Sequence, residues 1–64
     1  MTQKETLLAC ANAMRLIAAI YEEQADILAE ALLRKQAIAA KIEANRAGEK
    51  AQRYEELASD ALVW

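Results

Sequence analysis

Few residues of this chain could carry out acid–base chemistry, and those few fall on polar helical positions. The carboxylate pairs Glu22–Asp26 and Glu55–Glu56 could in principle share a proton, as the paired acids of some hydrolases do. Both pairs fall on the polar side of the helical pattern described below, where solvated charge explains them more simply. Histidine, the side chain best suited to proton transfer at neutral pH, is absent from the sequence. We therefore expect no catalytic residues and no enzymatic activity.

The sequence also lacks the residue types that build metal and cofactor sites. Cys10 is its single cysteine and lies in an apolar stretch with no base beside it, which is typical of a buried small hydrophobe. Zinc sites combine several cysteines and histidines, and di-iron bundles need Glu-x-x-His pairs. Gly48 is the only glycine, so a glycine-rich phosphate loop is missing as well. We predict no metal and no cofactor.

Charge is arranged in blocks along the chain. The formal net charge is −2, made up of −3 in residues 1–33, +4 in residues 34–53 and −3 in residues 54–64. The central basic block could pair with the acidic blocks of the same chain or of an antiparallel partner helix. Exposed pairs four residues apart along one helix, such as Glu30–Arg34, account for part of the pattern.

The basic block admits a second interpretation, which is contact with nucleic-acid phosphates. Arg46, Lys50 and Arg53 would be the contacting residues, and they share a face only if one helix runs through Gly48. The net acidity of the chain and the lack of aromatic residues in the basic block both disfavour nucleic acid. We keep a small RNA- or DNA-binding hairpin as an alternative function.

A wide apolar face follows the helical period of about 100° per residue along the first two-thirds of the chain. With no proline and a dominance of alanine, leucine and glutamate, this region favours helix. The residues within about 60° of Met14 are Leu7, Cys10, Ala11, Ile17, Ala18, Tyr21, Ala25, Leu28 and Leu32. The face is extended on one side by Leu16, Ile20, Ile27, Ala31, Ile38 and Ile42.

The width of this face predicts association with other helices. It covers about 200°, which is wider than the apolar stripe of an ordinary surface helix, so at least two neighbours must cover it. A chain of 64 residues can supply one of them. We therefore expect the protein to bind itself, most simply as a homodimer, or another protein, or both. The predicted interface consists of Met14, Ile17, Ile20, Tyr21, Gln24, Ile27, Leu28 and Leu32.

Gln24 is the one polar member of this predicted interface. It could lie at the edge of the interface and reach water. Alternatively, it could fix the register or the choice of partner, as a buried polar residue does in some coiled coils.

The only glycine predicts where the chain turns back. The apolar stripe through Ile38 and Ile42 ends near Arg46, and a displaced stripe begins at Ala47. Gly48 can adopt the left-handed conformation that ends many helices. Two alternatives remain: a single helix that continues through Gly48, and an earlier break near Asp26.

The predicted fold is therefore an all-α helical hairpin that associates into a helical bundle. Residues 1–64 form one domain: a long amphipathic helix over about residues 3–46, a turn at 47–48 and a short antiparallel helix over about residues 49–62. This arrangement would set side chains of the short helix against the second half of the long one. These side chains are Tyr54, Leu57, Leu62 and Trp64.

The sequence shows no membrane-spanning or secretory pattern. Its longest uncharged run, Thr6 to Met14, is far shorter than the roughly 20 apolar residues of a spanning helix. Binding to a membrane surface is disfavoured, because anionic lipids would repel the acidic polar face of the first half. We expect a cytoplasmic protein in which Cys10 stays reduced.

One short stretch resembles a known protein. The residues EEQADI, together with the Met-Thr start, are similar to Rop, a plasmid-encoded RNA-binding helical hairpin. The match covers six residues and lacks the basic and aromatic RNA-facing pattern of that family, so we assign no family. In length and build the chain also looks like the small hairpin co-chaperones of type III secretion needles and like small phage-encoded proteins directed at host proteins.

The predicted function is a non-enzymatic helical protein–protein interaction module. We expect a small regulatory protein, a self-associating adaptor or inhibitor, that binds another protein through the apolar face of its long helix. The alternatives are the nucleic-acid-binding hairpin that uses residues 34–53 and a co-chaperone hairpin of the secretion type.

Overall fold

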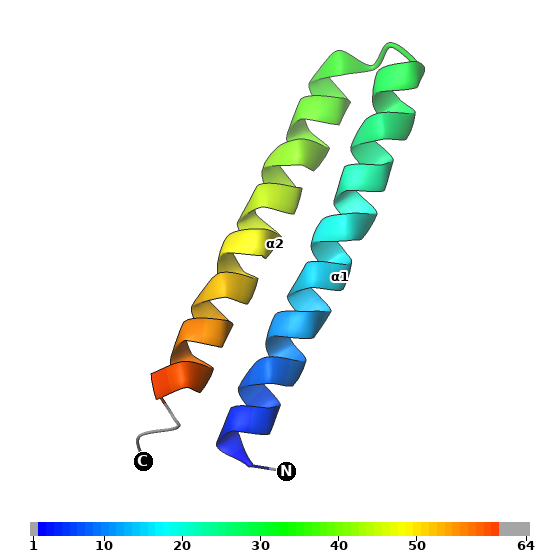
Figure 1. The fold of residues 1–64 in the computed structure, drawn as a ribbon. Coiled ribbons are helices and arrows are strands. Elements are labelled where there is room, and N and C mark those ends of the chain that lie inside the picture. Colours follow the sequence, from blue (N-terminus) through cyan, green and yellow to red (C-terminus); the bar gives the residue numbers. More distant parts are fainter. Residues whose placement is uncertain (1, 61–64) are drawn as a thin grey trace.

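The protein is a hairpin of two antiparallel α-helices of nearly equal length, as a computed structural model shows for residues 2–60 (Figure 1). Helix α1 spans Gln3–Glu30 and helix α2 spans Arg34–Asp60, with no strand among the described residues. The hairpin measures 50 × 16 × 9 Å along its principal axes. The prediction of an all-α helical hairpin is confirmed.

Helix α1 begins where the sequence predicts, because Thr2 caps it. The Thr2 hydroxyl accepts a hydrogen bond of 3.1 Å from the Glu5 backbone N–H, and the Glu5 carboxylate accepts one of 3.3 Å from the Thr2 N–H. This reciprocal capping box satisfies two of the N–H groups that have no partner within the helix.

The turn between the helices lies at Ala31–Leu33 and contains no glycine. The Leu33 N–H donates to the Leu28 carbonyl at 2.9 Å, and the Leu32 N–H donates to the Ala29 carbonyl at 3.0 Å. These two bonds form a Schellman motif, which satisfies the last carbonyls of α1. Leu32 holds the left-handed position of that motif with φ 62°. An L-residue other than asparagine or aspartate adopts this conformation at a cost of about 1–2 kcal/mol, whereas glycine, which has no Cβ, adopts it freely.

The prediction that the chain turns at Gly48 is wrong. Gly48 lies inside α2, which is continuous from Arg34 to Asp60, and a glycine in a helix interior costs only about 1 kcal/mol relative to alanine. The predicted long helix over residues 3–46 is therefore divided at the Ala31–Leu33 turn, and the predicted short helix is the second half of α2.

Two further parts of the hairpin prediction change with the turn. Tyr54 and Leu57 belong to the same helix as residues 34–46 and do not fold back on them. The C-terminal half of α2, to which they belong, lies beside the N-terminal half of α1 instead (Figure 1). The predicted helix end at residue 62, with Leu62 and Trp64, lies outside the described residues.

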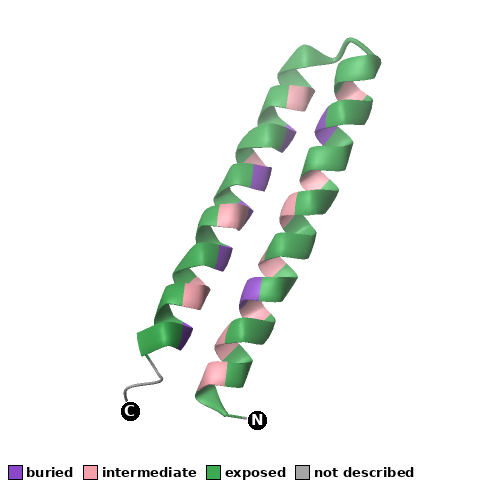
Figure 2. Ribbon diagram, in the orientation of Figure 1, coloured by how far each residue is buried: buried purple, intermediate pink, exposed green. Residues whose placement is uncertain are grey.

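The two helices meet along a regular seam with alternating steps of three and four residues, which is the spacing of a coiled-coil contact. Its residues are buried or half-buried and line the facing sides of the helices (Figure 2). We call these residues the hairpin seam. In α1 they are Leu7, Ala11, Met14, Ala18, Tyr21, Ala25 and Leu28, and in α2 they are Ala37, Ala40, Ala44, Ala47, Ala51, Tyr54 and Ala58.

Alanine makes the two helices fit closely. Equal steps outward from the turn bring Leu28 level with Ala37, and Tyr21 level with Ala44, so larger side chains of α1 meet small ones of α2. At Ala11 the arrangement is the opposite: the small residue belongs to α1, and the larger residue at the same level is Tyr54 of α2. Small side chains allow the Cα atoms of the two helices to approach within 8 Å. Within residues 2–60, all seven buried residues are alanines: Ala11, Ala25, Ala40, Ala44, Ala47, Ala51 and Ala58.

Candidate protein-interaction surface

Most of the large apolar side chains of the hairpin remain in contact with solvent. Among the described residues, none of the fully buried side chains is large. Leu32 is 78% exposed, Leu16 68% and Ile20 55%. The others that are exposed are Leu8, Ile17, Ile27, Leu33, Ile38, Ile42 and Leu57. The hairpin therefore buries alanine and leaves most of its branched aliphatic residues exposed.

Several of these exposed residues form a second seam along one flank of α1. They repeat with the same steps of four and three residues as the hairpin seam, and no member of the second seam is charged. We call this surface the α1 stripe. It consists of Thr6, Cys10, Ala13, Ile17, Ile20, Gln24 and Ile27, and Leu16 adjoins its outer edge. A stripe of this kind is typical of a helix that packs against a further helix.

The predicted interface residues are divided between three places. Ile17, Ile20, Gln24 and Ile27 lie together in the α1 stripe. Three others, Met14, Tyr21 and Leu28, are half-buried in the hairpin seam and contribute to the contact with α2. Leu32 lies in the turn. The wide apolar face of α1 is thus two adjacent seams, of which α2 of the same chain covers one.

The ion pair between Arg15 and Glu55 identifies the flank of the hairpin that lies opposite the α1 stripe. Each of these two residues directly follows a seam residue, Met14 or Tyr54. In an antiparallel pair, residues at equivalent positions beside the seam lie on the same side. The residues that directly precede seam residues therefore lie on the other flank. They include Ile17 and Gln24 in α1 and Glu43, Lys50 and Leu57 in α2.

The predicted nucleic-acid contacts lie on the same flank as the α1 stripe. Because α2 continues through Gly48, Arg46, Lys50 and Arg53 follow one another along one side of the helix. We call these three residues the basic strip. All three line a shallow groove of about 260 Å³ together with Glu49. Lys50 and Arg53 also line a second one, of about 270 Å³, with Tyr54 and Leu57. Arg46 donates a hydrogen bond of 3.0 Å to Glu43 within the same helix.

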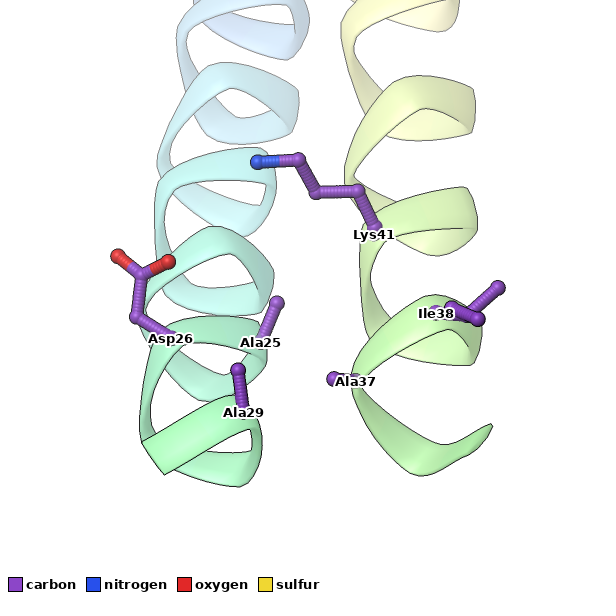
Figure 3. Close-up of a pocket in the computed structure, with 6 residues that line it drawn as sticks. All are labelled: Ala25, Asp26, Ala29, Ala37, Ile38 and Lys41. Atoms are coloured by element: carbon purple, nitrogen blue, oxygen red, sulfur yellow. The ribbon is translucent and has the colours of Figure 1, made fainter. Parts of the chain in front are cut away.

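A third shallow groove, of about 260 Å³, lies on the opposite flank near the turn (Figure 3). Ala25 and Ala29 of α1 face Ala37 of α2 there, and Lys41 extends across from α2 toward α1. Asp26 points away from α2. The charged side chains beside this groove make it less suited to an apolar partner than the α1 stripe.

The residues considered for chemistry are scattered over the described part of the hairpin. Residues 2–60 contain no group of three or more Cys, Asp or Glu side chains that could hold a metal ion. Cys10 is a free, half-buried thiol in the N-terminal part of the α1 stripe. Glu55 is engaged with Arg15, and Glu22 and Asp26 are exposed. Neither described helix has an apolar segment long enough to cross a membrane.

No family model, curated protein or solved structure matches this chain. The feature that sequence reasoning missed is the alanine seam of α2, which runs from Ala37 to Ala58. Its signal was present, because alanine recurs there with steps of three and four residues on both sides of Gly48. A small residue adds little to an apolar pattern, so the isoleucines at 38 and 42 outweighed the alanines beside them.

Proposed function

We propose that this protein is a non-enzymatic helical interaction module that associates through the α1 stripe. It binds a second copy of itself, and as a small adaptor or inhibitor it also binds another protein. One observation carries the proposal: of the residues that the structure describes, the hairpin buries only alanines, while three isoleucines of one uncharged stripe stay exposed.

The energetics of a small chain support this proposal. A domain of about 60 residues is close to the limit at which a core alone can stabilise a fold, and oligomerisation is a common supplement. Complete burial of an isoleucine side chain contributes about 1.5–3 kcal/mol. Covering Ile17, Ile20 and Ile27, which are 39%, 55% and 59% exposed, would therefore add several kcal/mol to a marginal hairpin.

Sedimentation equilibrium at micromolar protein concentration tests the proposal. The unmodified chain should be a dimer, and Ile20→Asp should shift it to monomer and lower its stability, because an unpaired carboxylate would be buried in the interface. Asn12→Asp is the matched control, since Asn12 is an exposed residue of the same helix outside the stripe. The control should remain a dimer. A well-folded monomer of the unmodified chain would overturn self-association.

A second candidate function is binding of RNA or DNA through the basic strip. The observation that favours it is the continuity of α2, which places Arg46, Lys50 and Arg53 along one side of the helix. Three phosphate contacts per hairpin would give a slope of about −3 when the logarithm of affinity is plotted against the logarithm of salt concentration. Absence of binding to mixed-sequence RNA and DNA at low salt would rule this candidate out. Apolar self-association should not weaken with salt in this way.

The cytoplasm is the location that we propose for this activity. A single cysteine cannot form a disulfide within one chain, and a half-buried thiol such as Cys10 stays reduced in that compartment. Fractionation of the native host, followed by a test for association with other proteins, would check both the location and the adaptor role.

A further inference from the structure

We infer that the α1 stripes of two copies pack against each other in antiparallel orientation, about a two-fold axis that passes beside Ile20. This inference rests on the proposed self-association and adds its geometry. It specifies which residues meet across the interface and distinguishes the arrangement from a parallel pair.

The spacing of the stripe is compatible with a two-fold axis at its centre. Ala13 and Ile27 are equally far from Ile20 along the helix, and Ile17 and Gln24 are nearly so. In an antiparallel pair Ile20 therefore lies next to Ile20 of the other copy, while Ala13 of each copy meets Ile27 of the other. The same patch is then used by both copies, as a closed two-fold dimer requires.

The charges of α1 favour the antiparallel orientation. The acidic residues near its C-terminal end are concentrated between Glu22 and Glu30, whereas Arg15 is the only charged residue between positions 10 and 18. A parallel pair would set each acidic segment beside the same acidic segment of the other copy, and neighbouring like charges repel. An antiparallel pair instead sets each acidic segment beside residues 10–18 of the other copy, which contain no acidic residue.

The charges on the adjoining flank of α2 are compatible with the same axis. Equal steps from the turn bring Ile20 level with Asn45, so Glu43 and Arg46 lie on either side of the axis. Rotation about the axis brings Arg46 of one copy toward Glu43 of the other, opposite in charge. The same rotation sets Lys50 about 15 Å along the bundle from Lys50 of the other copy, at 1.5 Å per residue. It sets Arg53 about 24 Å from Arg53 of the other copy. In a parallel pair related by a two-fold axis along the bundle, the two α2 helices would instead lie on opposite sides, and Arg46 would not approach Glu43 of the other copy.

Disulfide cross-linking distinguishes the two orientations. In a Cys10→Ala background, the single-cysteine variants Ile20→Cys, Ala13→Cys and Ile27→Cys are oxidised, alone and mixed in pairs. A disulfide needs Cα atoms within about 7 Å. An antiparallel dimer should cross-link with cysteine at position 20 alone, and in the mixture of the position 13 and position 27 variants. Position 27 alone should not cross-link, because its two copies lie about 21 Å apart along the helices.

Controls separate failure of the geometry from failure of self-association. Asn12→Cys, on the opposite flank, should give no covalent dimer, and sedimentation of each variant before oxidation establishes whether it is dimeric. Dimers that cross-link at position 27 alone, and do not cross-link in the mixture of the position 13 and 27 variants, would overturn the antiparallel inference and leave self-association standing. Dimers that cross-link in neither way would also overturn it. Monomers of every variant and of the unmodified chain would overturn both proposals.

Discussion

Arg15 of α1 donates a hydrogen bond to a carboxylate oxygen of Glu55 in α2, joining two residues that are 40 positions apart in the chain. Within residues 2–60 it is the one ion pair that links the two helices, since the other, Glu43–Arg46, lies within α2. Because the pair lies beside the seam and opposite the α1 stripe, it leaves the proposed interface free. The two helices are thus joined by the alanine-rich hairpin seam and by this ion pair at its edge.

This ion pair should contribute little to stability. The side chains of Arg15 and Glu55 are 54% and 43% exposed, and solvent screens a pair of this kind to about 0–1 kcal/mol. A double-mutant cycle with Arg15→Ala and Glu55→Ala, measured by urea unfolding, should give a coupling energy below about 1 kcal/mol that falls as salt is added. A salt-independent coupling of about 3 kcal/mol would contradict this expectation.

Replacement of Gly48 by alanine should stabilise the protein by about 1 kcal/mol, because Gly48 occupies a helix interior. An alanine Cβ at this position would have no neighbouring atom within 4 Å, so it causes no clash. The free energy of unfolding should be measured at fixed protein concentration, since self-association makes it concentration-dependent. A comparable loss of stability would instead indicate that Gly48 holds a left-handed turn.

Leu32→Gly should also stabilise the hairpin. Glycine removes the cost of about 1–2 kcal/mol for a left-handed leucine and adds about 0.5–1 kcal/mol of backbone entropy, so we expect a net gain of roughly 0.5–1 kcal/mol. Leu32 is 78% exposed, so little burial is lost. Leu33→Gly is the matched control and should lower the free energy of unfolding, because the φ of Leu33 is not positive. Equal effects of the two substitutions would argue against strain at Leu32.

A larger side chain in place of a buried alanine of the hairpin seam should destabilise the hairpin. Ala51 is 0% exposed, so Ala51→Leu forces extra methylene groups between closely packed helices at a cost of about 1–3 kcal/mol. Gln52→Leu adds a leucine at the neighbouring exposed position and should change stability by no more than about 0.5 kcal/mol. Thermal unfolding of the two variants, followed by circular dichroism, makes the comparison. If Ala51→Leu were as stable as the control, the seam would be looser than described.

The sequence was sufficient to predict helices, the start of α1 and a hairpin, but not the position of the turn. Sequence reasoning looks for glycine at a left-handed helix end, and here Leu32 occupies that conformation while Gly48 lies in a helix. The apolar residues also continue at helical spacing across the turn, through Leu32 to Ile38. The hydrogen bonds of the turn and the packing of alanines on both sides outweigh the local preference of one leucine.

The composition of the candidate site was predictable only in part. Sequence periodicity identified the wide apolar face of α1 but could not divide Met14, Tyr21 and Leu28 from Ile17, Ile20 and Ile27. That division depends on where α2 lies, and hence on the turn. Once α2 covers the first set, the second set is left as a separate stripe.

The turn at Ala31–Leu33 has a consequence for the order in which the chain folds. Pairs nearest the turn, such as Leu28 and Ala37, close a short loop and lose the least chain entropy, whereas Leu7 and Ala58 close the longest. The hairpin should therefore zip from its turn toward its open end, on the microsecond-to-millisecond scale of helical proteins with local contacts. Docking of two finished hairpins would be a later and slower event, whose rate rises with protein concentration.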